Sequence, residues 1–263
     1  MRAFLTGILF AATFTTATFA ADATPFNWQG SLPGGKTVEI KGVNGWIHAE
    51  TAIGGSIEVS ARRTGRKQDP NSVRIDVVQS ADGVTICAVY PDAKPGEPNE
   101  CKPGRGGRMN NKDNDVQVEF TVKIPAGLNL VAQNVNGEVK AEGLRADVRA
   151  TTVNGDVNVS TSGLAAATTV NGSIHANVGA FSWTDKLEFT TVNGSIDLTL
   201  PPGVSADLEA SSVNGGVYSD FQMTVRGELK PHQVNATIGG GGRRLKMTTV
   251  NGTIRIRQAG KTA

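Results

Sequence analysis

The sequence predicts an all-β protein whose second half is a parallel β-solenoid, and three observations favour this fold. The tripeptide Val-Asn-Gly occurs seven times, and from residue 135 onward it recurs, together with one divergent copy, at spacings of 16–22 residues. Residues at fixed offsets from each asparagine alternate between apolar and polar, the period of a strand. Aromatic residues make up only 5% of the chain while glycine reaches 32 of 263 residues, which suits small and β-branched side chains on repeated strands. Parallel crossovers are nearly always right-handed, so we expect a right-handed solenoid.

Each copy of the tripeptide is predicted to form a corner between two strands. Glycine supplies a positive-φ turn position without steric cost. Asparagine amides stacked in rungs about 4.8 Å apart can bond to one another. The predicted corner ladder comprises Asn44, Asn136, Asn154, Asn171, Asn193, Asn214 and Asn251 with Gly45, Gly137, Gly155, Gly172, Gly194, Gly215 and Gly252, and Val234-Asn235-Ala236 is a divergent copy.

The residues around each corner define the expected interior. Every position three residues after the asparagine is β-branched and apolar, and every position six residues before it is apolar. A single rung cannot bury such a face alone, whereas stacked rungs can. Asn-Gly also marks β-hairpins, so a sandwich of antiparallel hairpins is the alternative. The nearly constant phase of the copies favours the solenoid.

Residues 1–20 have the features of a secretion signal. Arg2 precedes an uncharged, largely apolar stretch, and small residues follow at a cleavage site after Ala20 or as late as residue 23. A retained membrane anchor is the alternative. We expect an exported protein, periplasmic or extracellular, with no membrane segment after cleavage and a single domain over residues 24–263.

The N-terminal half is predicted to interrupt the repeat with an antiparallel hairpin and a long loop. The hairpin covers residues 72–90 and turns near Asp82-Gly83, and an alternating strand covers residues 116–124. Ile53-Gly54-Gly55 offers a possible second corner of the first rung. Residues 91–114, rich in Pro, Gly, Asn and charge, are expected to be a flexible loop or, alternatively, a recognition loop.

Cys87 and Cys101 are the only cysteines, and an exported protein with an even count usually oxidises them. A bridge here would close the base of the loop and contribute about 3 kcal/mol on the chain-entropy account. A metal pair is the alternative, but it lacks a CxxC spacing and partner histidines.

The repeated Thr-Val-Asn-Gly-x-Ile strands, the segment from Val118 to Gly127 and the secretion signal resemble the bacterial putative-adhesin domain family of unknown function. The resemblance covers residues 36–258. It implies a β-solenoid exported to the cell envelope, and it brings no catalytic residues to assign.

Candidate chemistry in the sequence is sparse. Glu138 and Asp156 would lie on adjacent rungs, where paired carboxylates could perform acid–base catalysis, although no third group converges on them. The histidines, His48, His175 and His232, fall in different rungs, so we expect no metal site and no cofactor. The formal net charge of +2 gives no reason to expect a nucleic-acid partner.

These features predict a non-catalytic envelope protein whose flat β-faces bind a surface glycan or another envelope protein. The first alternative is a polysaccharide lyase or hydrolase on a β-helix, which has fold-level analogy as its only support. The second alternative is a structural or signalling component of the envelope, in which the solenoid is a spacer.

Overall fold

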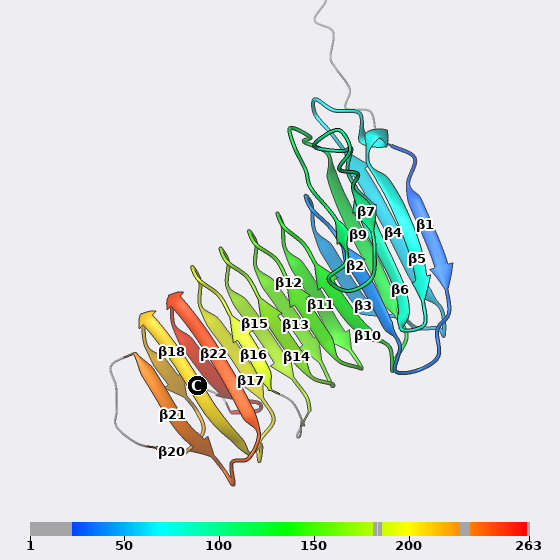
Figure 1. The fold of residues 1–263 in the computed structure, drawn as a ribbon. Coiled ribbons are helices and arrows are strands. Elements are labelled where there is room, and N and C mark those ends of the chain that lie inside the picture. Colours follow the sequence, from blue (N-terminus) through cyan, green and yellow to red (C-terminus); the bar gives the residue numbers. More distant parts are fainter. Residues whose placement is uncertain (1–22, 181–182, 184–185, 227–231, 262–263) are drawn as a thin grey trace, which may run out of the picture.

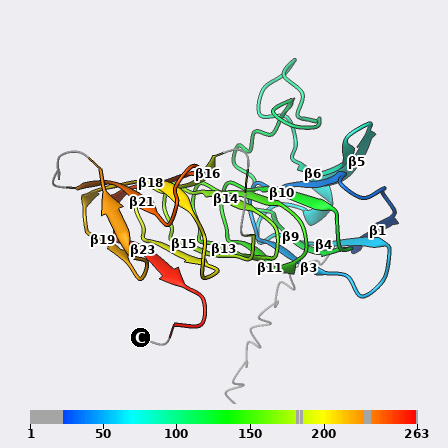
Figure 2. The same ribbon diagram turned by 90° about the horizontal axis from the view of Figure 1, so that it is seen from below.

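The computed structural model describes residues 23–180, 183, 186–226 and 232–261. Two long, mainly parallel sheets lie face to face and run the length of the molecule (Figures 1 and 2). Sheet A contains, in spatial order, β1 (Phe26–Gly30), β4 (Ile57–Thr64), β9 (Gln117–Ile124), β3 (Ile47–Thr51), β11 (Val139–Leu144), β13 (Val157–Thr161), β15 (Ile174–Val178), β17 (Ile196–Leu200), β23 (Ile254–Gln258) and β19 (Val217–Ser219).

Sheet B is formed mainly by the strands that precede the corners. Its spatial order is β20 (Met223–Val225), β21 (Gln233–Ile238), β18 (Ala206–Asn214), β22 (Arg244–Asn251), β16 (Leu187–Thr190), β14 (Ala165–Thr168), β12 (Val148–Thr151), β10 (Asn129–Gln133), β2 (Thr37–Lys41), β6 (Gly83–Val89) and β5 (Arg74–Ser80). A short 3-10 helix, η1 (Pro70–Ser72), precedes β5, and β7 (Glu100–Cys101) pairs with β8 (Gly107–Arg108) in a small separate sheet.

Each Val-Asn-Gly corner joins a strand of sheet B to a strand of sheet A, which makes one rung. Equivalent residues of neighbouring rungs are paired in parallel: Leu130 lies beside Val148, and Val139 beside Val157. Successive asparagines from Asn44 to Asn193 also form parallel bridges. The predicted parallel solenoid is therefore confirmed.

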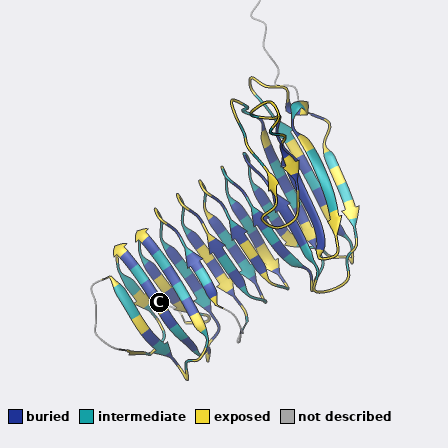
Figure 3. Cartoon of the chain, viewed as in Figure 1, coloured by how far each residue is buried: buried dark blue, intermediate teal, exposed yellow. Residues whose placement is uncertain are grey.

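The interior is a column of small and branched side chains contributed by both sheets. Buried residues alternate with more exposed ones along the strands of both sheets (Figure 3). Ile47, Val139, Val157, Ile174, Ile196 and Ile254, all three residues after a corner asparagine, are each 0% exposed. From sheet B, Val38, Leu130, Val148, Ala165, Leu187, Leu245 and Leu208 are buried opposite them. Full burial of a Val, Leu or Ile side chain contributes about 1.5–3 kcal/mol, so every rung depends on its neighbours for stability.

The order of the rungs in space differs from their order in the sequence. Strands β22 and β23 pair with β16 and β17 on one side and with β18 and β19 on the other. The last rung of the chain is therefore inserted before the rung of Asn214, which lies at the end of the stack. Only the copies from Asn44 to Asn193 stack in the order in which they occur in the sequence.

The divergent copy Val234-Asn235-Ala236 is not a corner. It lies within β21, which runs antiparallel to β18 and closes sheet B together with β20. Alanine after Asn235 replaces the glycine that every stacked corner carries, and the segment instead protects the edge of the sheet. The segment that resembles a divergent copy of the repeat in the sequence is therefore not a rung of the solenoid.

The N-terminal end is closed by antiparallel strands, as the sequence indicated. Strands β5 and β6 form the predicted hairpin. Strands β6 and β9 pair in parallel with β2 and β3 of the first rung. Beyond β9, β4 pairs antiparallel with β9, and β1 pairs antiparallel with β4. Ile53-Gly54-Gly55 does not form a second corner. It lies in the connection from β3 to β4, which are strands of the same sheet on either side of β9.

Residues 91–114 join β6 to β9, at the place where the later rungs have their compact corner. This segment projects from sheet B in Figure 2. The predicted secretion signal at residues 1–20 lies outside the described residues. Within the described residues, no helix has the length and apolar character needed to cross a membrane.

Candidate binding face

The corner asparagines form a continuous amide ladder along one edge of the molecule. In each step, Nδ2 of one asparagine donates to Oδ1 of its neighbour over 2.7–2.9 Å. The order is Asn44, Asn136, Asn154, Asn171, Asn193, Asn251 and Asn214, which repeats the spatial order of the rungs. At the outermost N-terminal position, Asn44 Nδ2 donates to the carbonyl oxygen of Asn114 in the loop.

A second column supports the ladder from inside. The hydroxyl groups of Thr152, Thr169, Thr191, Thr249 and Ser212 each donate to the carbonyl oxygen of a corner glycine in the adjacent rung, over 2.7–2.9 Å. All of these side chains are buried. In the rung of Asn136, the equivalent Asn134 donates its side-chain amide to the Gly45 carbonyl over 2.7 Å.

The corner glycines are required mainly by this close stacking. Gly45, Gly137 and Gly155 have positive φ, as expected, but no such angle occurs at Gly172, Gly194, Gly215 or Gly252. A Cβ at any of those four would clash with the carbonyl group of the glycine in the neighbouring rung. The expectation that turn conformation explains every glycine was therefore wrong for the later rungs.

The outer face of sheet A is polar and flat, and an aromatic pair lies near one end of it. The Trp46 and His48 rings stack with centroids 3.9 Å apart and planes 24° apart. His48 Nε2 lies 3.7 Å from Glu138 Oε2, and Glu138 Oε1 accepts a hydrogen bond from the Asn158 amide over 2.7 Å. Consecutive rungs therefore contribute an aromatic surface, a carboxylate and an amide side by side.

Further along this face, a shallow hollow of about 420 Å³ crosses several rungs. Asp197 is the centre of its charged groups: His175 Nδ1 lies 3.6 Å from Oδ2, and Arg257 donates to Oδ1 over 3.3 Å. Asn158, Asn177 and Thr199 also line it. At the end of the stack, exposed Tyr218 has the Arg255 guanidinium 6.0 Å from its ring centroid. Such a row of donors, acceptors and aromatic rings suits an extended polar ligand.

Glu138 and Asp156, the residues considered for catalysis, lie on adjacent rungs as expected, directly before the paired Val139 and Val157, but their carboxylates have different partners. Glu138 is engaged with Asn158 and His48, whereas Asp156 accepts the backbone N–H of Ser173 over 2.7 Å. His48 and His175 have different carboxylate partners, and His232 lies beyond β19, outside sheet A. Among the described residues, no group of three or more His, Cys, Asp or Glu side chains could hold a metal ion.

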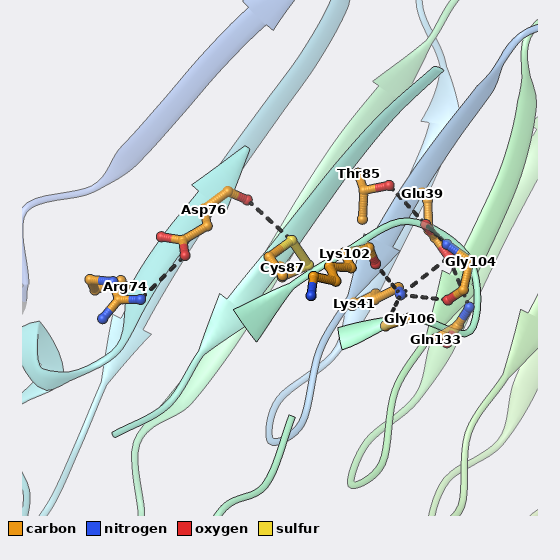
Figure 4. Close-up of a disulfide and its surroundings, with 11 residues drawn as sticks. Glu39, Lys41, Arg74, Asp76, Thr85, Cys87, Lys102, Gly104, Gly106 and Gln133 are labelled. Carbon is orange, nitrogen blue, oxygen red and sulfur yellow. Dashed lines mark hydrogen bonds and ion pairs between the residues drawn. A yellow bond between two sulfur atoms is a disulfide. The ribbon is translucent and has the colours of Figure 1, made fainter. Parts of the chain in front are cut away.

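The loop of residues 91–114 is fixed to sheet B at several points (Figure 4). The structure joins Cys87 of β6 to Cys101 of β7 by a disulfide. The ammonium group of Lys41 donates to the carbonyl oxygens of Lys102 and Gly104 over 2.6 Å each and of Gly106 over 3.3 Å. The loop thus has secondary structure and buried contacts, and its flexibility stays a prediction.

Glu39 lies beside Lys41, and both side chains are almost completely buried. The carboxylate of Glu39 accepts hydrogen bonds from the Thr85 hydroxyl, the Gly104 N–H and the Gln133 amide over 2.8–3.0 Å. Its Oε1 lies 3.7 Å from Lys41 Nζ. Both charges therefore have partners, so the pair can be buried under the loop without leaving an isolated ion.

The base of the loop is closed by two further polar groups. Buried Asn99 donates its side-chain amide to the carbonyl oxygens of Tyr90, Pro91 and Asn110 over 2.7–3.1 Å. The Tyr90 hydroxyl donates to the Val116 carbonyl over 2.7 Å, and burial raises the pKa of this phenol far above its ordinary value. These bonds hold the end of β6 close to the start of β9.

Comparison with known proteins places this repeat in a family. The Toastrack DUF4097 family matches residues 104–257, more than half of the chain. The chain belongs to this family. The match confirms the resemblance inferred from the repeats, although it begins at residue 104 rather than residue 36.

Solved structures show similarity to this Toastrack chain at low identity. A putative cell adhesion protein from Clostridium sporogenes ATCC 15579 is 12% identical, with 89% of this chain and 100% of that chain covered and a TM-score of 0.49. A putative adhesin from Bacteroides fragilis NCTC 9343 is 13% identical, with 89% and 97% covered and a TM-score of 0.36. No curated protein matches the chain.

Sequence reasoning missed the most distinctive side chains of this Toastrack chain. Trp46 and His48 follow the first corner two residues apart, but their stacking needs coordinates to be seen. Lys41 and Glu39 were not recognised as a buried pair, because the loop that covers them is distant in sequence. The sequence contained one signal for this pair. Strand alternation places Lys41 on the outer side of its sheet, and the Pro- and Gly-rich insertion of residues 91–114 is the segment that covers it.

Proposed function

We propose that this Toastrack protein is a non-catalytic, exported scaffold of the cell envelope that binds a surface polysaccharide on the outer face of sheet A. The observation that carries the proposal is the Trp46–His48 stack at the head of a flat row of polar side chains. Aromatic faces pack against the apolar faces of sugar rings, while amide, carboxylate and hydroxyl groups bond to sugar hydroxyls. The in-register rungs repeat such groups about every 4.8 Å along the stack.

Export is proposed from the sequence of residues 1–20, and a disulfide is consistent with an oxidising compartment. The alternative of a polysaccharide lyase or hydrolase at Glu138 and Asp156 gains no support from the geometry, because the two carboxylates bond to different partners. A spacer role would not require an aromatic pair on an otherwise polar face.

The test is binding of the mature protein to a panel of purified neutral and acidic bacterial polysaccharides, measured by affinity electrophoresis. The variant Trp46→Ala should weaken binding of the recognised polymer about tenfold or more, and His175→Ala with Asn177→Ala should weaken it further. Lys246→Ala with Thr248→Ala changes two residues of the opposite sheet and serves as the matched control. Equal binding by the Trp46 variant and the control would rule out sheet A as the site.

A further inference from the structure

A groove on the outer face of sheet B lies between that sheet and the disulfide-closed loop. One hollow of about 620 Å³ is bounded by β2, β6, β10, β12 and the loop tip at residues 103–105. A second hollow of about 270 Å³ shares Thr37, Val131 and Arg149 with the first and continues to Lys186. The two hollows therefore form one elongated depression across several rungs.

The groove carries unneutralised positive charge. Arg105 from the loop tip and Arg149 from β12 line the larger hollow, and neither forms an ion pair with any residue that the structure describes. Glu39 also lines it, but its oxygens already accept hydrogen bonds from Thr85, Gly104 and Gln133, and Lys41 lies beside it.

Two further carboxylates, Asp82 and Asp147, line the groove. Asp82 is exposed on the rim of the larger hollow. Asp147 lines the smaller hollow, where its Oδ1 accepts the Leu164 N–H over 2.9 Å. The larger hollow is therefore lined by two guanidinium groups from different elements, the loop tip and β12.

The walls between the charges are polar and small. Thr37, Ser80 and Gln133 contribute hydroxyl and amide groups to the larger hollow, and Ala165 and Ala166 form part of the smaller one. In β14, Ala166 is paired with Arg149 of β12, so a small side chain leaves space beside the guanidinium. Guanidinium groups bind carboxylates in a bidentate geometry, and hydroxyl and amide groups suit the hydroxyls of a sugar.

We propose that this groove binds a carboxylate-bearing stretch of an acidic polysaccharide, with Arg105 and Arg149 as the carboxylate ligands. The site is separate from the outer face of sheet A, and it goes beyond the function proposed there. The position of Arg105 depends on the Cys87–Cys101 disulfide and on the Lys41 contacts to Lys102, Gly104 and Gly106. The disulfide thereby makes anion binding sensitive to reduction.

The experiment is isothermal titration of the oxidised protein with oligogalacturonate, with the fully methyl-esterified oligomer as the uncharged control. Arg105→Ala and Arg149→Ala should each weaken binding about tenfold, the expected effect of losing one charge-assisted contact. Arg145→Ala removes a nearby exposed arginine outside the groove and should leave binding unchanged. Asp82→Asn removes the carboxylate on the rim and should strengthen binding.

Two further measurements test whether the groove needs the disulfide and whether its arginines recognise carboxylates. Reduction with dithiothreitol, or the double variant Cys87→Ser with Cys101→Ser, should weaken binding as much as Arg105→Ala does. Equal binding of the esterified oligomer, or full binding by both arginine variants, would overturn the proposal. Binding of polyphosphate but not oligogalacturonate through the same arginines would also overturn the assignment to carboxylates. Trp46→Ala should not affect this titration, so failure here is distinguishable from failure of the site on sheet A.

Discussion

At the scale of the residue, the corner is explained by three columns with different partners. The asparagine side chain bonds to the asparagine of the next rung, the buried threonine hydroxyl bonds to a glycine carbonyl, and the glycine leaves room for that carbonyl. The sequence predicted the asparagine column from its repetition, and it shows a threonine two residues before several of the corner asparagines. It could not predict the threonine acceptors, because a hydroxyl can bond to many carbonyls and the pairing depends on how the rungs stack.

The buried threonine column predicts a contrast between two adjacent residues. Thr169 is 1% exposed and donates to the Gly155 carbonyl over 2.8 Å, whereas Thr168 points outward. Thr169→Val leaves the partly buried Gly155 carbonyl without this donor and should lower the free energy of unfolding by about 1 kcal/mol. Thr168→Val should change it by less than about 0.5 kcal/mol. Urea denaturation of both variants checks this, and equal effects would mean that the hydroxyl bond contributes nothing.

Asp115 predicts a contribution to stability that depends on pH. The backbone N–H of Gln68, followed by those of Lys67 and Arg66, holds the pKa of this carboxyl below its ordinary value. A depressed folded-state pKa stabilises the fold above the unfolded value of about 3.9, and the contribution is lost as the pH falls through the folded value. Asp115→Asn should therefore lower Tm near neutral pH, and its difference from the unmodified protein should shrink on acidification.

The control for Asp115 is Asp113→Asn, because the described residues make no hydrogen bond or ion pair with the Asp113 carboxylate. Thermal melts of both variants across pH 2–7 separate the two effects. A constant difference between Asp115→Asn and the unmodified protein over this range would contradict the assignment.

At the scale of the element, regular strands were predictable and the loop was not. Strict alternation identified β9, and a turn signal identified the β5–β6 hairpin. The contacts of residues 91–114 depend instead on Lys41 and Glu39, which lie more than 50 residues earlier in the chain. Local sequence patterns carry no information about such pairing, so composition alone suggested a flexible segment.

The two lysines of sheet B predict different costs for losing an ion pair. Lys41 is buried between Glu39 and three loop carbonyls, whereas Lys246 lies partly exposed 3.8 Å from Glu209. Lys41→Met leaves a buried carboxylate without its cation and should cost about 3–5 kcal/mol. Lys246→Met should cost less than about 1 kcal/mol. Chemical denaturation of the oxidised proteins measures both values, and a small effect at Lys41 would show that the loop is not held by this charge.

At the scale of the whole molecule, the order of the rungs explains which copies of the repeat are most alike. Thr190 to Ile196 and Thr248 to Ile254 are nearly identical in sequence, and these two corners are neighbours in space. The copy around Asn214 has Ser211-Ser212 and Gly216 in place of the threonines and the later polar residue, and it lies at the end of the stack. Divergent terminal repeats are typical of solenoids. Thr168 to Ile174 is identical to Thr190 to Ile196, so the likeness between copies did not by itself reveal that the last rung is inserted before the rung of Asn214.

A solenoid of this kind should tolerate the loss of one complete rung. Deletion of residues 155–171 joins Asn154 to Gly172 and restores the corner Val153-Asn154-Gly172-Ser173-Ile174. The shortened protein should keep its β circular dichroism and a cooperative unfolding transition, because each rung contacts only its neighbours. Deletion of residues 155–163 removes half a rung and should abolish folding. Equal loss of structure in both variants would contradict the modular account.

The central claim is that the corners lie in register, with the last rung of the chain between the corners of Asn193 and Asn214. Val192, Val250 and Val213 are exposed beside this edge, and the Val250 N–H bonds to the Val192 carbonyl. A disulfide needs Cα atoms about 4.4–6.8 Å apart, whereas rungs separated by an intervening one are roughly 9–10 Å apart. Cysteine pairs at positions 192 and 250, and at positions 213 and 250, should therefore form disulfides on oxidation. A cysteine pair at positions 192 and 213 should stay reduced. Peptide mass mapping detects each bridge. A bridge between positions 192 and 213, with none between 192 and 250, would contradict the account.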